Sequence, residues 1–104
     1  MQDTLIDINA MRSAATEACR LMKALSNPDR LLLLCQLVQA ERCVSELEEL
    51  TGISQPTLSQ QLGVLRQEAL VQTRREGKNI YYSLASPQVL AIMKTLYEQF
   101  CPPA

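Results

Sequence analysis

The sequence predicts a mainly helical fold with one small β-hairpin, in the order helix, helix, helix, helix, hairpin, helix. Apolar residues recur at helical spacing in successive stretches of the chain. Near the C-terminal end, two β-prone runs flank a Glu-Gly-Lys-Asn turn, which is a hairpin signal. The length of 104 residues suits one domain. We therefore expect residues 1–104 to form a single domain.

The first predicted helix covers residues 8–25. Ser26-Asn27-Pro28 ends it, and Pro28 suits the first turn of a second helix over about residues 29–39. This second helix is apolar on nearly every side, so we expect it at the centre of the domain. In the first helix, apolar residues spaced three or four apart form a narrow stripe: Ile8, Met11, Ala15, Ala18, Met22 and Leu25.

Residues 44–69 are predicted to form two helices joined by a tight turn, which is the helix-turn-helix arrangement. Ser45, with Glu48 three residues later, predicts a capping box at the start of the first of these helices. Gly52 predicts its end, because glycine readily adopts the left-handed conformation of a helix C-terminus.

The second helix of this pair has the features of a recognition helix. Ser54 is predicted to cap it, with Pro56 in its first turn, and it ends near Ala69. Its amide and hydroxyl side chains gather near the N-terminal end, where such groups pair with base edges in the major groove. The predicted DNA-binding residues of this helix are Gln55, Pro56, Thr57, Ser59, Gln60 and Arg66, and its buried stripe is Leu58, Leu62 and Leu65.

The hairpin over residues 70–84 follows directly and makes the arrangement a winged helix-turn-helix. Basic side chains cluster at its tip, at Arg74, Arg75 and Lys78, where we expect contacts to backbone phosphates. Pro87 then opens the last predicted helix, over residues 87–100.

The charge distribution fits a local DNA-binding surface on an acidic chain. The net charge is −1, yet residues 1–49 carry −3 and residues 50–83 carry +2. The positive potential therefore coincides with the predicted helix-turn-helix and hairpin.

Other functional classes lack their usual signals. No apolar run approaches the roughly 20 residues of a membrane span, and the N-terminus lacks the basic start of a secretory signal. We therefore expect a cytoplasmic protein with no membrane partner. With no histidine, glycine-rich phosphate loop or CxxC pair, we expect neither an enzyme nor a metal or cofactor site.

The motifs together resemble those of the ArsR family of arsenical-resistance repressors. The matching stretches are LSNPDRL at 25–31, GISQPTLSQQL at 52–62 and RREGK at 74–78, and the resemblance extends from about residue 14 to residue 101. Many members carry histidine where this chain has Gln60. The resemblance implies a homodimer held by helices 8–25 and 87–100, with each recognition helix in one half of a palindromic operator.

The cysteines indicate what such a repressor would sense. Cys43-Val44-Ser45 holds only the first cysteine of the family's Cys-Val-Cys metalloid motif, and the histidines of its zinc sites are missing. Cys35 and Cys101 are similar to the dithiol of the persulfide- and sulfide-responsive subgroup, which includes biofilm-growth repressors. This resemblance implies that reaction of the pair with persulfide or related reactive sulfur species releases the operator and derepresses sulfide-detoxification genes.

Two alternatives remain open at the level of sequence. The same two thiols together with Cys43 or Cys19, as a set of ligands, would suit a metalloid or soft-metal sensor of the same fold. A DNA-binding anti-repressor, which only displaces a second regulator, would carry the same DNA-binding motifs. Cys35 would also serve as a buried core residue of its leucine-rich helix.

Overall fold

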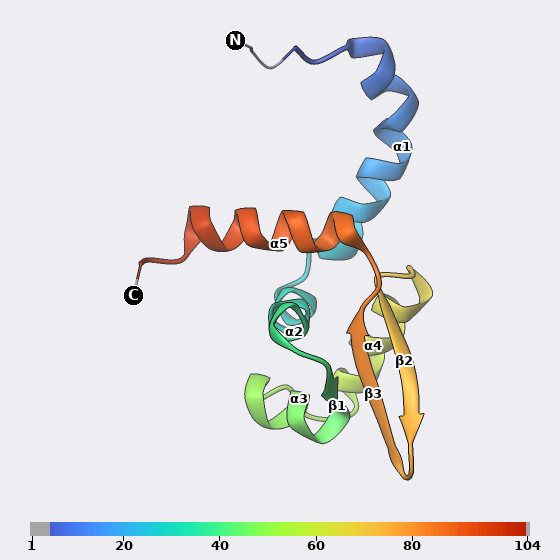
Figure 1. Cartoon of the computed structure of the whole chain (residues 1–104), viewed down its shortest axis with the longest axis vertical. Coiled ribbons are helices and arrows are strands. Elements are labelled where there is room, and N and C mark those ends of the chain that lie inside the picture. The colour runs from blue at the N-terminus through green and yellow to red at the C-terminus, as the bar shows by residue number, and fades with distance from the viewer. Residues whose placement is uncertain (1–4, 104) are drawn as a thin grey trace.

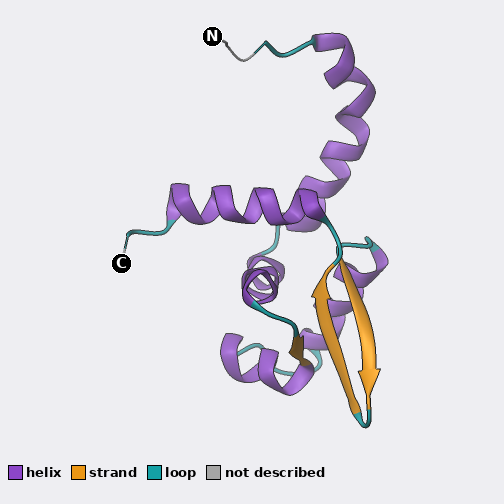
Figure 2. Cartoon of the chain, in the orientation of Figure 1, coloured by secondary structure: helices purple, strands orange, loops and turns teal. Residues whose placement is uncertain are grey.

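The computed structural model, which describes residues 5–103, confirms the mainly helical fold with a hairpin (Figure 1). One short strand that the sequence did not indicate, β1, joins the hairpin to make a three-stranded sheet (Figure 2). In chain order the elements are α1 (Ile8–Leu25), α2 (Pro28–Gln39), β1 (Arg42–Cys43), α3 (Val44–Thr51), α4 (Thr57–Gln67), β2 (Val71–Glu76), β3 (Asn79–Leu84) and α5 (Pro87–Phe100).

Helix α2 lies at the centre of the fold, as its apolar composition predicts. Leu33 and Leu34 are fully buried, and α2 contacts every other helix as well as β3. The predicted stripe of α4 completes this core, since Leu58, Leu62 and Leu65 are at most 2% exposed. Burial of these leucines fixes which face of α4 is left for solvent.

Helix α3 begins one residue after Cys43, and the predicted Ser45 cap is wrong. The strand β1 explains this start, because Cys43 is held in an extended conformation by pairing with Tyr81 of β3. The Cys43 N–H donates to the Glu46 carboxylate at 2.9 Å, while the Ser45 hydroxyl lies 3.3 Å from the Cys43 sulfur. Gly52 ends the helix with φ +75°, as predicted.

Helix α4 begins at Thr57, directly after Pro56, so the predicted cap at Ser54 is also wrong. The Gln55 side chain takes this role, since its carbonyl oxygen accepts the Ser59 N–H at 3.1 Å. Ser54 contributes its main-chain carbonyl, which accepts the Leu58 N–H at 3.0 Å. The N-terminal end of α4 is thus held by a longer side chain than expected.

The hairpin of β2 and β3 extends beyond the helices (Figure 1). The strands pair antiparallel from Val71 with Leu84 to Glu76 with Asn79, which leaves a two-residue turn at Gly77 and Lys78. β1 lies on the other side of β3. The wing is therefore anchored to the chain segment that links α2 and α3.

Helix α1 rises away from the rest of the chain and meets it at its C-terminal end (Figure 1). Within α1 only Ala24 and Leu25 are buried, whereas Ile8 and Met22 are each 63% exposed. Most of its apolar stripe is thus exposed to solvent. No helix in the described part of the chain is long and apolar enough to span a membrane.

Candidate nucleic-acid interface and dithiol groove

The side chains that the sequence analysis predicts for base recognition lie at the N-terminal end of α4. Because the leucine stripe faces the core, Gln55, Ser59 and Gln60 are exposed, as is Pro56, and Thr57 is half-buried. Gln60 is exposed, and its side-chain amide carries both the acceptor and the donor that bidentate pairing with adenine requires. Gln55 has its oxygen engaged by the Ser59 N–H and keeps its amide donors.

The far end of α4 and the turn of the hairpin carry exposed basic groups. Arg66 lies in the last turn of the helix, and Arg75 and Lys78 lie at the tip of the wing. Among residues 5–103, none of these three is held in an ion pair. They are available for phosphate contacts.

Arg74 has a different environment from the other bases of the wing. Its guanidinium donates to both Glu41 carboxylate oxygens at 2.8–3.0 Å and to Glu76 at 3.1 Å, and it lies 4.7 Å from the centre of the Tyr81 ring. The hydrogen bonds to Glu41, and then to Glu76, raise the pKa of Arg74. The Arg74 charge therefore lies beside two carboxylates that offset it.

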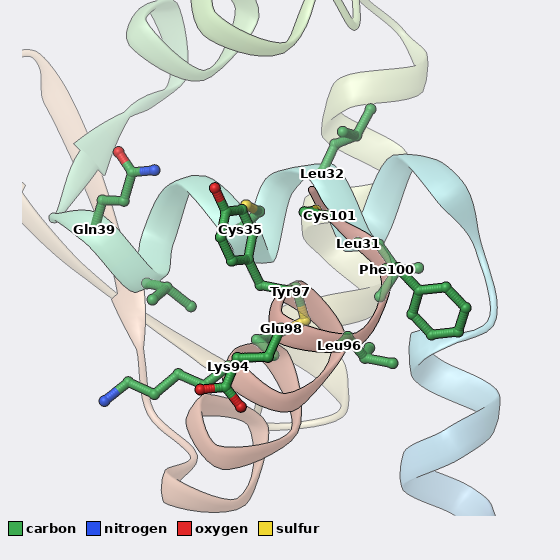
Figure 3. A pocket seen from close by; sticks show the side chains of 12 residues that line it. Leu31, Leu32, Cys35, Gln39, Lys94, Leu96, Tyr97, Glu98, Phe100 and Cys101 are labelled. Carbon is green, nitrogen blue, oxygen red and sulfur yellow. The ribbon is translucent and has the colours of Figure 1, made fainter. Parts of the chain in front are cut away.

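The two cysteines singled out by the sequence line one apolar groove between α2 and α5 (Figure 3). The groove has a volume of about 710 Å³. Cys35 lies half-buried on α2, and Cys101 is exposed directly after α5, where its N–H donates to the Tyr97 carbonyl at 2.9 Å. Both are free thiols. Leu31, Val38, Met93 and Leu96 add apolar side chains to the walls.

The remaining cysteines do not line this groove. Cys19 is exposed on α1 beside Arg20, and Cys43 is buried at the start of α3. Over residues 5–103, no three cysteine, histidine or acidic side chains are grouped so as to hold a metal ion.

Among residues 5–103, three arginine side chains contact side chains distant in sequence, and the sequence reasoning missed all three; one is the exposed pair of Arg20 on α1 with Glu68 at the end of α4. Arg74 binds Glu41, and Arg30 of α2 binds the Gln61 side chain of α4. Arg30 belongs to the quoted LSNPDRL motif, but nothing in a single sequence points to its partner 31 positions later. The Glu41 contact depends on β1, which has no pattern of its own.

Known proteins match this chain closely. The family model for bacterial regulatory proteins of the arsR family matches residues 27–73, from α2 into β2. The biofilm growth-associated repressor of Agrobacterium fabrum is 50% identical over 98 residues, which cover 94% of this chain and 84% of that protein. The transcriptional activator HlyU of Vibrio cholerae is 36% identical, over 92% of this chain and 89% of the activator.

Solved structures give the same assignment. The transcriptional repressor BigR from Xylella fastidiosa superposes with a TM-score of 0.90 at 46% identity, covering 94% of this chain and all of that one. A homodimeric winged helix-turn-helix DNA-binding domain from Mycobacterium bovis has a TM-score of 0.73 at 32% identity, covering 94% of this chain and 89% of its own. With this winged helix-turn-helix fold and these relatives, the chain belongs to the ArsR family of bacterial transcriptional regulators.

Proposed function

We propose that the chain is a dimeric transcriptional repressor that acts in the cytoplasm and binds a palindromic operator. It releases this operator when Cys35 and Cys101 react with persulfide or related reactive sulfur species, which derepresses sulfide-detoxification genes. The observation that carries the sensing step is the shared groove, because a thiol on α2 and a thiol directly after α5 line one apolar surface. The repressor role is supported by relatives named as repressors.

A second copy of the chain is the partner that the exposed apolar surface of α1 requires. Ile8, Met11 and Met22 on α1, and Tyr97 and Phe100 on α5, are 47–80% exposed. Large apolar side chains left exposed along two helices indicate an association surface. The M. bovis relative is itself described as homodimeric. In the dimer, the two copies of α4 enter successive major grooves about one helical turn apart.

In this proposal the residues of α4 and the wing divide the work of DNA binding. Base edges are read by Gln60, Thr57 and Ser59. Gln55 donates from its free amide, and Pro56 packs against the major groove of the DNA at the start of the helix. Arg66, Arg75 and Lys78 contact phosphates and give affinity without sequence preference. Arg74 keeps the wing in place and adds less charge than its neighbours.

The sensing chemistry needs no oxidant other than the persulfide. The thiolate of the exposed Cys101 attacks the outer sulfur of glutathione persulfide, whose S–S bond breaks and whose glutathione leaves as a thiolate. The Cys35 thiolate then attacks the resulting Cys101 persulfide and expels hydrosulfide, leaving a Cys35–Cys101 disulfide. Both thiol protons end on the released glutathione and sulfide. If a second sulfur is added to Cys101 first, the same closing attack gives a trisulfide.

A covalent bridge at this place ties α5 to the centre of the fold. α2 contacts every other helix, and α5 carries exposed apolar residues of the proposed dimer surface. Fixing one helix against the other changes the relative position of the two copies of α4. A coupling of about 1–3 kcal/mol would weaken operator binding roughly 5- to 150-fold.

Operator binding measured by fluorescence anisotropy tests this proposal. The probe is labelled duplex DNA from upstream of the protein's own gene, and reduced protein is compared with protein treated with glutathione persulfide, peroxide or arsenite. We expect persulfide alone to weaken binding of the wild type, while Cys35→Ser and Cys101→Ser stay bound. Cys19→Ser is the control and responds like the wild type. Release by arsenite alone would replace the proposal with the metalloid-sensing alternative.

The anti-repressor alternative has one observation in its favour, since a relative 36% identical is named a transcriptional activator. Transcription in vitro with purified RNA polymerase separates the two functions. A repressor lowers transcription from the promoter when it is the only regulator present. An anti-repressor has no effect until a second DNA-binding protein is added.

A further inference from the structure

We infer that Arg30 is a positioning residue for operator recognition, because it joins the recognition helix α4 to the root of the dimerisation helix α1. This inference rests on the proposed function, in which α4 reads DNA and α1 pairs with a second copy. Arg30 lies in the first turn of α2, where the Asn27 side chain accepts its main-chain N–H at 3.0 Å.

One edge of the Arg30 guanidinium closes the C-terminal end of α1. Its Nε donates to the Ala24 carbonyl at 2.5 Å, and its Nη2 donates to the Lys23 carbonyl at 3.2 Å. Carbonyl oxygens in the last turn of a helix have no N–H donor within the helix, and a positive charge there is favourable. Arg30 therefore holds the end of α1 by both hydrogen bonds and charge.

The remaining nitrogen of the same group reaches α4. Nη1 of Arg30 donates to the Gln61 side-chain oxygen at 2.8 Å, and both residues are half-buried. The guanidinium is planar and its donors have fixed directions, so all three acceptors are held at one mutual geometry. A lysine at this position would offer a point charge on a flexible stem and would lose this constraint.

The orientation of α1 depends strongly on such a link because α1 is anchored only near its C-terminal end. Ala24 and Leu25 are the buried residues of the helix. A second bond between Arg20 and Glu68 measures 2.7 Å, but the Arg20 side chain is 71% exposed, and exposed ion pairs contribute little. An 18-residue helix is about 27 Å long, so a tilt of about 10° at its root moves the far end by roughly 5 Å.

Such a displacement matters for a dimer that binds two half-sites. The distance between the two copies of α4 must match the helical repeat of DNA, so loss of the Arg30 link lowers affinity for the operator. Affinity for unrelated DNA is governed by phosphate contacts and stays unchanged. The ratio of these two affinities is therefore the quantity that Arg30 controls.

The test measures anisotropy with two duplexes, the promoter fragment and a scrambled sequence of equal composition. The variants are Arg30→Gln, Arg30→Lys, Gln61→Ala and the double variant Arg30→Gln with Gln61→Ala. Gln67→Ala is the matched control, since Gln67 is an exposed glutamine at the end of α4. Thermal unfolding by circular dichroism and sedimentation show whether each variant is folded and dimeric.

We expect Arg30→Gln, Arg30→Lys and Gln61→Ala each to lower the ratio of promoter to scrambled affinity about tenfold, the effect of one hydrogen bond to a charged group. The double variant should be no worse than Arg30→Gln, and Gln61→Glu, which keeps an acceptor, should retain the wild-type ratio. Two results would overturn the role of Arg30 while leaving the proposed function in place. One is a double variant whose loss of the affinity ratio equals the sum of the two single losses, and the other is a folded Gln61→Ala variant with the wild-type ratio. A wild type that shows no promoter preference would overturn the proposed function, and this inference with it.

Discussion

The basic residues of the wing differ in how free their charges are, and the salt dependence of DNA binding should reveal it. Each phosphate contact made by a protein makes the slope of log K against log salt concentration more negative by about 0.9. Lys78 is exposed and forms no ion pair within residues 5–103, and a dimer presents it twice. Lys78→Gln should therefore make the slope shallower by about 1.8. When the salt concentration is lowered from about 200 mM to 50 mM, the ratio of wild-type to variant DNA affinity should therefore rise about 12-fold.

Arg74 should behave differently although it lies only four residues away. Its guanidinium already donates to Glu41 and Glu76, so few counterions are released when it approaches DNA. Arg74→Gln should leave the slope close to that of the wild type, even where loss of the wing's internal contacts lowers affinity at every salt concentration. Arg75→Gln should follow Lys78→Gln, because Arg75 is exposed and unpaired among the described residues.

Anisotropy titrations of scrambled duplex DNA at four or more salt concentrations give these slopes. Lys94→Gln on α5 is the control, because Lys94 borders the dithiol groove rather than the wing. The reasoning is refuted if Arg74→Gln flattens the slope by about 1.8 while Lys78→Gln leaves it unchanged.

The remaining predictions concern stability. Gly52→Ala should destabilise the fold by about 1–2 kcal/mol, because φ is +75° there, whereas Gly63→Ala in α4 should stabilise it by about 0.5–1 kcal/mol. Urea unfolding by circular dichroism measures both, and equal signs would contradict the assigned backbone geometry. The Glu46 carboxylate accepts hydrogen bonds from Cys43, mainly from its main-chain N–H, and these lower its pKa from the ordinary value of 4.5. It therefore stabilises the fold above that value, and this stability is lost as the pH falls through the lower folded pKa. Glu46→Gln should lose less melting temperature than the wild type on acidification to about pH 3, and an equal loss would rule out this carboxylate as a source of acid sensitivity.

Local patterns predicted most of the fold. The bounds of α1 and α5 agree with the predicted ranges 8–25 and 87–100, because apolar spacing and the flanking prolines act within a few residues. The strand β1 has only two residues and exists through pairing with β3, nearly forty positions later. Its absence from the prediction also explains the misplaced cap of α3, since the extended segment decides where that helix begins.

The candidate site was predictable in residue type but not in the state of each side chain. Sequence placed glutamines and hydroxyls at the start of α4, and the structure leaves most of them exposed. It did not indicate that the Gln55 side chain caps the helix, or that Arg74 forms an ion pair with Glu41, 33 positions earlier in the chain. Such contacts depend on which segments the fold brings together, and that follows from the topology of the whole chain.

Mass spectrometry of tryptic peptides is the most direct test of the central claim, the Cys35–Cys101 switch. Cleavage after lysine and arginine places the four cysteines in four separate peptides, 13–20, 31–42, 43–66 and 95–104. Protein treated with glutathione persulfide should yield peptide 31–42 joined to 95–104 through a disulfide or trisulfide, in proportion to the operator released. Persulfide-released protein in which these two peptides remain unlinked, or are joined to 13–20 or 43–66 instead, would contradict the account.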